Sequence, residues 1–197
     1  MAIDASDVKK LRDMTGVGMM DARSALEETK GDLDRAALLL RKKGQATAAK
    51  KAERAASEGL VESYIHPGSR VGVLVEVNCE TDFVARTDDF KNFVKEIAMH
   101  IAAANPLYVN DSDVPEELIE KEKEIYKEQM RDAKKPDDVI EKILSGKIDK
   151  FLSEIVLLRQ PWIKDDKMTI GDLATDQVAK LGENIVIRRF SRFSLGE

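Results

Sequence analysis

The sequence contains very few of the side chains on which catalysis and metal binding depend. Among 197 residues there are one cysteine, Cys79, and two histidines, His66 and His100. The histidines lie far apart, without a carboxylate spacing typical of a metal site, and there is no Gly-rich phosphate loop. We expect His66 to flank a turn and His100 to be a half-exposed helix residue. We therefore expect no metal, no cofactor and no enzymatic activity.

The single cysteine excludes a disulfide within the chain, which is typical of proteins from a reducing cytosol, whereas a disulfide between two copies stays open. The N-terminus lacks the basic and apolar regions of a signal peptide. No run approaches the ~18 apolar residues of a membrane span. Together these absences predict a soluble, cytoplasmic protein that does not associate with membranes.

What the chain does contain is a highly charged surface around an apolar core. Charged residues make up 35% of the sequence and hydrophobic residues 43%, so a packed core is expected and an intrinsically disordered chain is excluded. The formal net charge is -5. An acidic chain is a poor candidate for direct nucleic-acid binding, because such binding needs a basic surface that displaces the counterions of the phosphates.

Residues 1–55 show only helical patterns. Three short helices are expected, because a break at residues 15–18 separates the first from the second, and Gly31 and Gly44 end the second and the third. Small residues recur where these helices would touch. The pattern predicts an N-terminal three-helix bundle of the ubiquitin-associated type, which at this size is only marginally stable alone.

Residues 45–58 are rich in alanine and charge and contain no large apolar side chain. Such a composition favours a helix that has nothing to bury, and we expect a helical linker. The cations of this region are Lys42, Lys43, Lys50, Lys51 and Arg54. They raise an alternative function, an adaptor that binds RNA or a peptide through the basic linker. The acidic balance of the chain favours a solvated helix face instead.

Residues 56–197 carry the pattern of an α+β domain. Residues 60–66 and 71–77 flank a Pro-Gly turn and predict a β-hairpin, and residues 185–193 predict a third strand. Helices are expected near residues 87–104, 115–131, 136–158 and 169–182, with Gly146 as a break. The fold class is therefore α+β, with about three strands packed against helices behind the N-terminal bundle and linker.

The most informative stretch lies between the second strand and the following helix. It reads Asn78-Cys79-Glu80-Thr81-Asp82-Phe83-Val84-Ala85-Arg86. An aromatic side chain and a carboxylate thus stand side by side at a strand-to-helix connection, a position suited to contact with another molecule. On general grounds Phe83 would instead pack in the core and Asp82 would cap the helix, because phenylalanine is among the most buried residue types.

A second segment near the N-terminus completes the pattern. It reads Leu11-Arg12-Asp13-Met14-Thr15-Gly16-Val17-Gly18-Met19-Met20-Asp21-Ala22. The two segments together resemble the elongation factor Ts family of guanine-nucleotide exchange factors. The resemblance covers essentially the whole chain. It implies that the protein binds elongation factor Tu, both GDP-bound and nucleotide-free, disturbs its magnesium and nucleotide site, and promotes GDP release during translation elongation.

The resemblance also implies which residues meet the partner. In the family, the Thr-Asp-Phe-Val motif projects from the core and inserts its phenylalanine between helices of the GTPase domain, near the magnesium site. The matching residues here are Thr81, Asp82, Phe83 and Val84. The implied N-terminal contacts are Leu11, Arg12, Thr15, Gly16, Val17, Gly18, Met19 and Met20, with Val17 where family members commonly have alanine. Adjacent methionines at a helix start also favour partner binding on physical grounds, since their side chains are flexible and apolar.

Two further expectations concern the end of the chain and its assembly. Residues 188–193 combine arginines with aromatics, which is a pattern of nucleic-acid binding, but a sheet strand with solvated arginines is the favoured interpretation. Some family members have a core with a duplicated-looking second half and a protruding helical hairpin, and this chain is too short for both. A single core copy predicts that two chains assemble into a homodimer around a dimerisation-type domain.

Overall fold

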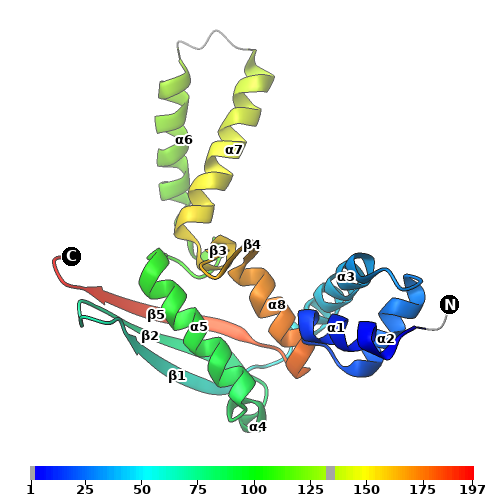
Figure 1. Ribbon diagram of the computed structural model, residues 1–197. Helices are drawn as coiled ribbons and strands as arrows, with labels where there is room; N and C mark the ends of the chain where they lie inside the picture. The colour runs from blue at the N-terminus through cyan, green and yellow to red at the C-terminus, as the bar shows by residue number, and fades with distance from the viewer. Residues whose placement is uncertain (1–2, 132–135) are drawn as a thin grey trace. The chain divides into compact units, whose positions relative to one another are not determined.

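The computed structural model describes residues 3–131 and 136–197 (Figure 1). Its contacts divide the chain into two units that are each assembled from distant segments. The first unit comprises Met1–Val61, Glu76–Val94 and Leu173–Ile187, and the second comprises Glu62–Val75, Lys95–Asp172 and Arg188–Glu197. Helices and an antiparallel sheet occur together, which confirms the predicted α+β class. The predicted domain division at residue 55 stays a prediction.

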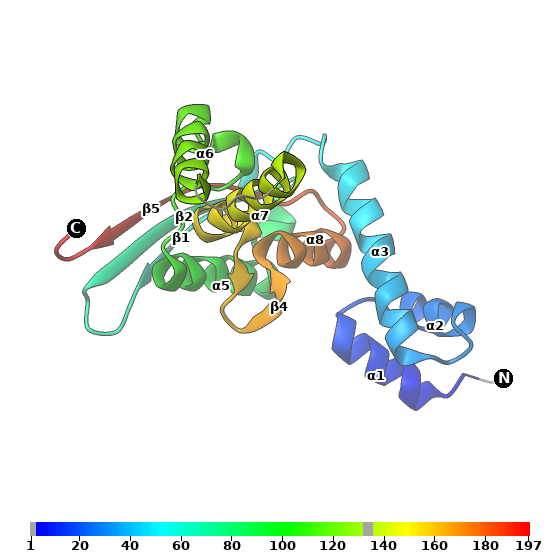
Figure 2. The ribbon, with the colours of Figure 1, turned by 90° about the horizontal axis from the view of Figure 1, so that it is seen from above.

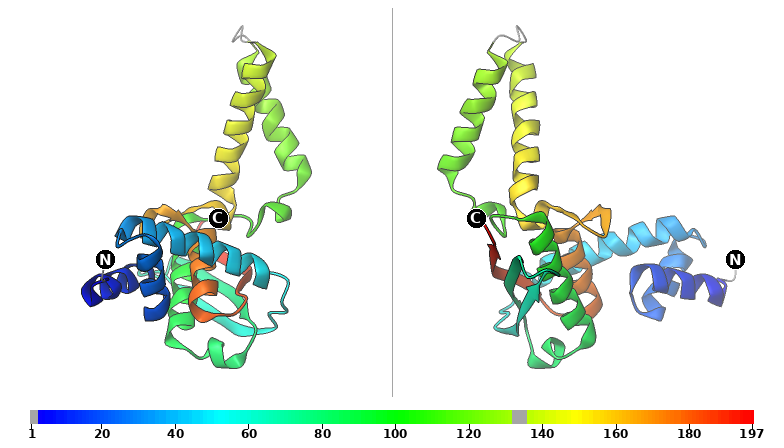
Figure 3. Two further views of the ribbon diagram at one scale, coloured as in Figure 1. Left: turned by 90° about the vertical axis from the view of Figure 1, so that its right-hand side faces the viewer. Right: turned by 60° about the vertical axis from the view of Figure 1, so that its left-hand side comes forward.

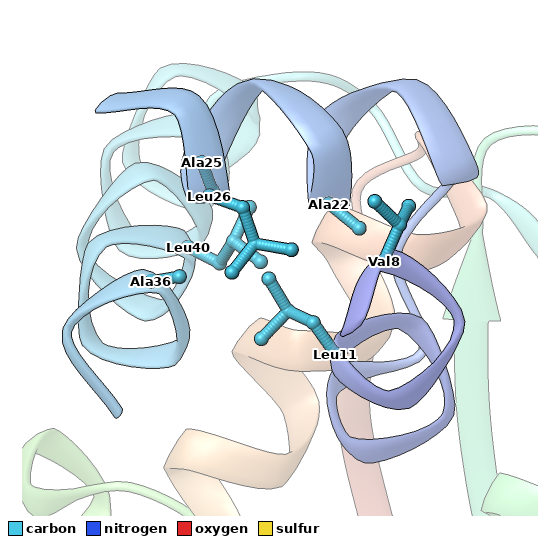
Figure 4. Packing of buried hydrophobic residues seen from close by; sticks show 7 residues of the cluster. All are labelled: Val8, Leu11, Ala22, Ala25, Leu26, Ala36 and Leu40. Atoms are coloured by element: carbon cyan, nitrogen blue, oxygen red, sulfur yellow. The ribbon is translucent and has the colours of Figure 1, made fainter. Parts of the chain in front are cut away.

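Three helices form the N-terminal part of the first unit, as the sequence predicted: α1 (Ala5–Thr15), α2 (Met19–Glu28) and α3 (Leu33–Lys51) (Figure 2). The Asp4 carboxylate caps α1, and Gly16 ends it in the left-handed region with φ 70°. The helices share a small core of Val8, Leu11, Ala22, Ala25, Leu26, Ala36 and Leu40, whose side chains point toward one another (Figure 4). The many alanines in this core let the helices approach closely.

The predicted end of the third helix at Gly44 is wrong, because α3 continues through Gly44 to Lys51. The glycine is buried where α3 passes α8 (Ile170–Leu181), and a Cβ added to it would lie 3.4 Å from the Cβ of Ala179. Gly44 therefore serves a close helix–helix approach and does not break the helix. The first part of the expected linker is the last part of α3, and β1 begins six residues after Ala52, at Glu58.

A three-stranded sheet forms with the order β1-β2-β5, from β1 (Glu58–Ile65), β2 (Val71–Cys79) and β5 (Val186–Ser194). One side of β2 is buried through Val73, Val75, Val77 and Cys79, as the alternation predicted. Helix α5 (Asp88–Ala104) runs along this sheet (Figure 1) and buries its apolar stripe of Phe90, Phe93, Val94, Ile97 and Ile101. The predicted hairpin and third strand are thus confirmed.

The second unit contains a helical hairpin of α6 (Glu116–Met130) and α7 (Asp137–Ile155), which lie side by side in Figures 1 and 3. A cluster at its base buries Val114, Ile148, Leu152 and Val156. The predicted break at Gly146 is wrong, because α7 runs through it and nothing lies within 4 Å of a Cβ added there. The chain was expected to be too short for both a duplicated second half of the core and a helical hairpin. The structure contains the hairpin.

Smaller elements complete the second unit. The sequence analysis missed an antiparallel pair of short strands, β3 (Pro161–Trp162) and β4 (Asp165–Thr169). Two 3-10 turns, η1 (Asp111–Asp113) and η2 (Leu157–Arg159), are joined by a forked ion pair of Arg159 with Asp111 at 2.6 Å. Among the residues described, no helix has both the length and the apolar content to cross a membrane.

The expectation that His100 is half-exposed is wrong, because its side chain is fully buried in the second unit. Its Nε2 lies 3.0 Å from the Gln160 Oε1, and its Nδ1 accepts from the Ile163 N–H at 3.4 Å. The neutral ring with its proton on Nε2 satisfies both bonds, and burial lowers the pKa of His100. The residue is a hydrogen-bonded part of the core.

Substitutions of the two glycines inside helices, Gly44 and Gly146, are expected to have opposite effects on stability. Gly146→Ala adds a methyl group in open space and removes the glycine's backbone entropy, so we expect it to stabilise the protein by roughly 0.5–1 kcal/mol. Gly44→Leu drives a large side chain against Ala179, and we expect it to destabilise by roughly 1–3 kcal/mol. Urea unfolding followed by circular dichroism measures both, and a Gly44→Leu protein as stable as the wild type would contradict the close approach of α3 and α8.

Candidate protein-binding site

The Thr-Asp-Phe-Val motif forms a single helical turn, α4 (Asp82–Ala85). Thr81 is its N-cap, and the Thr81 Oγ1 accepts from the Val84 N–H at 3.4 Å. Within the turn, Asp82 pairs with Arg86 at 2.6 Å, four residues later. The Thr87 hydroxyl then donates to the Val84 carbonyl and accepts from the Phe90 N–H, so one turn passes directly into α5.

Phe83 is 77% exposed at this turn. The general expectation that Phe83 packs in the core is therefore wrong. Phe90 and Phe93 on the following helix fill the core, while Ala85 is the buried residue of α4. A large aromatic ring held in solvent at the tip of a strand-to-helix connection leaves apolar surface available to a partner.

The tip, which comprises residues 80–84, is held in place by hydrogen bonds to Glu183. The sequence analysis did not select this glutamate. The Glu183 Oε2 accepts from the backbone N–H groups of Glu80 and Thr81, each at 3.0 Å, and its Oε1 accepts from the Thr81 hydroxyl at 2.6 Å. One carboxylate thus holds three donors at the start of the turn. No local pattern could have indicated this contact, since 102 residues separate Thr81 from Glu183.

The neighbouring residues extend this brace to the end of α3. Asn184 donates its backbone N–H to the Glu80 carboxylate at 2.7 Å and its side-chain amide to the Arg54 carbonyl at 2.8 Å. Arg54 in turn lies 3.6 Å from the Glu80 carboxylate. The Lys51 ammonium donates to the Gly182 carbonyl. Residues 182–184 are therefore a junction that joins the tip, α8 and the last turn of α3 within the first unit.

Cys79 lies directly before the tip and is fully buried. Its thiol donates to the Thr81 carbonyl at 3.1 Å. Burial, followed by the charge of Glu183, raises the pKa of Cys79 to about 11. The thiol therefore stays protonated at neutral pH and acts as a packing and hydrogen-bonding group.

The N-terminal segment combines buried and exposed residues at the corner between α1 and α2. Met20 is 76% exposed, and Met14 and Met19 are exposed beside it. Val17 packs partly against the bundle core, and Leu11 is fully buried within it. Leu11 can therefore shape this corner from inside but presents no surface to a partner. The methionines supply the apolar surface here.

Lys180 of α8 links the α1–α2 corner to the start of α5. A Cβ added to Gly16 would lie 3.7 Å from the Lys180 Cδ, so the lysine stem runs past this corner. The Lys180 ammonium pairs with Asp89 at 2.9 Å, in the first turn of α5. Within the first unit, one lysine thus contacts the N-terminal candidate segment and the helix that follows the second candidate segment.

The basic groups of the linker are largely engaged in the structure. Lys43 pairs with Glu28 at 2.7 Å, while Lys51 and Arg54 bind within the junction described above. In the last strand, Arg192 is mostly buried and bonds to the Glu197 carboxylate at 2.9 Å. Among the residues described, no group of three or more His, Cys, Asp or Glu side chains is placed to hold a metal.

Comparison with known proteins gives the family. A model of the family described as elongation factor TS matches residues 27–197. The chain is 58% identical over 195 residues to elongation factor Ts of Caldanaerobacter subterraneus subsp. tengcongensis, covering 99% of this chain and 98% of that protein. The chain belongs to the elongation factor Ts family. It is also 57% identical to the protein of Carboxydothermus hydrogenoformans, over 99% and 90% of the two chains, and 56% identical to that of Alkaliphilus oremlandii, over 100% and 91%.

Membership of the elongation factor Ts family confirms the predicted class of function. The protein is the nucleotide exchange factor for elongation factor Tu in translation elongation, and such a factor is not an enzyme. Because translation elongation in bacteria is a cytoplasmic process, the protein acts in the cytoplasm.

The protected thiol of Cys79 gives a direct test of the geometry at the tip. With a pKa of about 11, about one Cys79 thiol in a thousand is ionised at pH 8. We expect iodoacetamide to alkylate the native protein at least ~100-fold more slowly than the urea-unfolded protein, in which the thiol has its ordinary pKa. Mass spectrometry of timed samples measures both rates. Equal rates before and after unfolding would show that the thiol is not buried beside Thr81.

Proposed function

We propose that the protein opens the nucleotide site of elongation factor Tu by inserting Phe83 between helices of the GTPase domain. The observation that carries this proposal is the 77% exposure of Phe83 on a turn that Glu183 braces from behind. A GTPase holds GDP partly through Mg²⁺, which bridges phosphate oxygens and a few protein oxygens. An apolar ring that parts the surrounding helices moves these ligands, so the metal leaves and GDP affinity falls.

Insertion of the Phe83 ring, the wedge, contributes too little free energy on its own for a large acceleration of GDP release. Full burial of one phenylalanine contributes roughly 1.5–3 kcal/mol, which corresponds to about 10-fold to 100-fold in rate. Other contacts must add to it. Thr81 and Val84 frame the ring on the same turn, and Asp82 offers an anionic oxygen, although its pairing with Arg86 would have to open before a partner cation could replace it.

We assign the additional contacts to the corner between α1 and α2. Its exposed methionines, Met19 and Met20, provide flexible apolar surface, and Arg12 adds an exposed cation paired with Asp13 at 2.9 Å. Thr15, Gly16, Val17 and Gly18 shape the turn that presents them. Leu11 contributes indirectly, because its burial in the bundle core fixes the corner. Binding at this corner raises affinity for the partner, whereas the wedge weakens GDP binding.

The alternative of an RNA- or peptide-binding adaptor has less support. It depends on the basic linker, where Lys43, Lys51 and Arg54 already bind acidic or carbonyl oxygens of the chain. A nucleic-acid function would show strongly salt-dependent affinity and no effect on GDP release. These two measurements separate the adaptor from the exchange factor.

Replacement of the wedge is expected to reduce exchange without unfolding the protein. Phe83→Ala removes a ring that packs little in the free protein, so stability stays within about 0.5 kcal/mol of the wild type. The maximal rate of release of a fluorescent GDP analogue from elongation factor Tu should fall about 10-fold to 100-fold. Stopped-flow fluorescence at saturating factor measures this rate.

A matched control is Leu107→Ala, which removes another exposed apolar side chain, from the second unit. This variant should accelerate GDP release as the wild type does. Acceleration by Phe83→Ala equal to that of the wild type would move the mechanism to the N-terminal corner. A wild-type protein without any effect on GDP release would exclude the exchange function itself.

We also propose that the protein is a homodimer formed through the open side of the sheet in the second unit. Phe193 is 71% exposed there, and Ile65, Leu74 and Leu195 are exposed as well. A Cβ added to Gly72 would lie 3.0 Å from the Ile65 Cδ1, so Ile65 shares a side with Gly72 and, by alternation, with Leu74.

These residues form one surface, since Ile65, Gly72, Phe193 and Leu195 line a single hollow and the Leu195 N–H donates to the Arg70 carbonyl at 2.9 Å. We take a second copy as the occupant, because a two-fold axis brings the same apolar patch of both chains together and buries it on each. The length of the chain, which allows a single copy of the core, also predicted an assembly of two copies.

Charge placed at this surface is expected to separate the dimer. Phe193→Asp puts a carboxylate into the proposed interface, and light scattering coupled to size exclusion should give the mass of one chain instead of two. Phe83→Asp is the matched control, because it places the same charge at an equally exposed phenylalanine and should keep the wild-type mass. A monomeric wild-type protein, or a dimer that survives Phe193→Asp, would exclude this interface.

A further inference from the structure

We propose that Glu183 is a positioning residue for nucleotide exchange, which holds the turn 81–84 in the orientation that presents Phe83. This inference rests on the proposed wedge and adds to it the group on which its geometry depends. Glu183 belongs to neither candidate contact segment and lies on the loop between α8 and β5. Its action is indirect, because both of its carboxylate oxygens already bind donors of the turn.

The turn needs such a support because it is too short to be stable through its own hydrogen bonds. Helix α4 has four residues, and the first turn of a helix orders several backbone angles for very few hydrogen bonds. Its N-cap bond from the Val84 N–H to the Thr81 Oγ1 is long, at 3.4 Å. The bonds that Glu183 accepts from the same residue, Thr81, are shorter, at 3.0 and 2.6 Å, and are strengthened by the charge.

The hydroxyl of Thr81 links the two sets of bonds. Because it donates its proton to Glu183, its lone pairs face the Val84 N–H and can accept there. The carboxylate thus fixes the direction of the cap, and the cap holds the peptide group that follows Phe83. Loss of the carboxylate would free the Thr81 hydroxyl to rotate and would leave the N–H groups of Glu80 and Thr81 without their acceptor.

Glu183 is itself held in place from several directions. Gly182 ends α8 in the left-handed region with φ 77°, which turns the chain toward the tip, and its carbonyl accepts from Lys51. On the other side, Asn184 bonds to the Glu80 carboxylate and to the Arg54 carbonyl. The carboxylate is therefore preorganised before the partner binds, and no ordering cost falls on the complex.

The test is Glu183→Gln, which keeps the size of the side chain but replaces one acceptor oxygen by an NH₂ group that faces other donors. Loss of charged hydrogen bonds of this kind typically lowers a rate about 10-fold. We expect the plateau rate of GDP release at saturating factor to fall by about that amount, while the factor concentration at half-saturation changes less than about 3-fold. Glu128→Gln, at an exposed pair with Arg131, removes the same charge and should behave as the wild type.

A double variant separates positioning from a general effect on folding. If Glu183 acts through the wedge, Glu183→Gln has no further effect on the plateau rate once Phe83→Ala is present. An additional loss equal to that in the wild-type background would overturn the inference. Should Glu183→Gln fail to fold, as judged by circular dichroism, Thr81→Val removes the hydroxyl with its bond to Glu183 and its cap bond from the Val84 N–H. Thr81→Ser, which keeps the hydroxyl, is expected to release GDP faster than Thr81→Val.

The outcomes also distinguish this inference from the proposed function. A wild-type plateau rate that falls with Phe83→Ala but not with Glu183→Gln or Thr81→Val overturns the positioning role and leaves the wedge in place. A wild-type protein that does not accelerate GDP release overturns both. A loss with Glu183→Gln that disappears in the Phe83→Ala background supports both.

Discussion

The position of the exposed ring of Phe83 depends on the contact of one carboxylate, that of Glu183, with the start of one helical turn, α4. Phe83 has no packing of its own to hold it, because it is exposed. Its position comes from the backbone of Glu80 and Thr81, which Glu183 holds through three hydrogen bonds. The same loop continues through Asn184 to the end of α3. An apolar ring can stay in water at a defined place only if polar bonds behind it supply the rigidity that burial supplies elsewhere.

Periodic patterns predicted the regular part of the fold well. The alternation of Val73, Val75 and Val77 and the apolar stripe of α5 correspond to the buried sides in the structure, because burial repeats with the period of the element. The structural roles of the glycines were harder to predict. Gly31 and Gly16 lie in the left-handed region, but Gly44 and Gly146 lie inside helices. A sequence does not distinguish a glycine that ends a helix from one that admits a neighbouring helix, since the difference depends on tertiary contacts.

The candidate site also has features that the sequence indicated and features that it could not indicate. The position of residues 81–84 after a strand and the resemblance to a family together indicated this motif. The general tendency of phenylalanine to be buried would have placed Phe83 in the core. Glu183 could not be found, because its partners lie 102 and 103 residues away. His100 was misplaced for the same reason, since its partner Gln160 comes from another segment. Leu11 belongs to the N-terminal candidate segment yet lies in the bundle core, so a sequence motif can include residues that support a surface as well as residues that form it.

The order of synthesis has a consequence for this arrangement. The strand that completes the sheet and the carboxylate that braces the tip both come from the last residues of the chain, β5 and Glu183, whereas the N-terminal bundle is made first and has its own core. A nascent chain on the ribosome therefore acquires the helical corner early but lacks a rigid tip until Glu183 and β5 have emerged. Under the proposed function, a chain that has not yet reached Glu183 would present the exposed methionines of the helical corner without the carboxylate that holds Phe83 in place, so binding surface would form before the wedge.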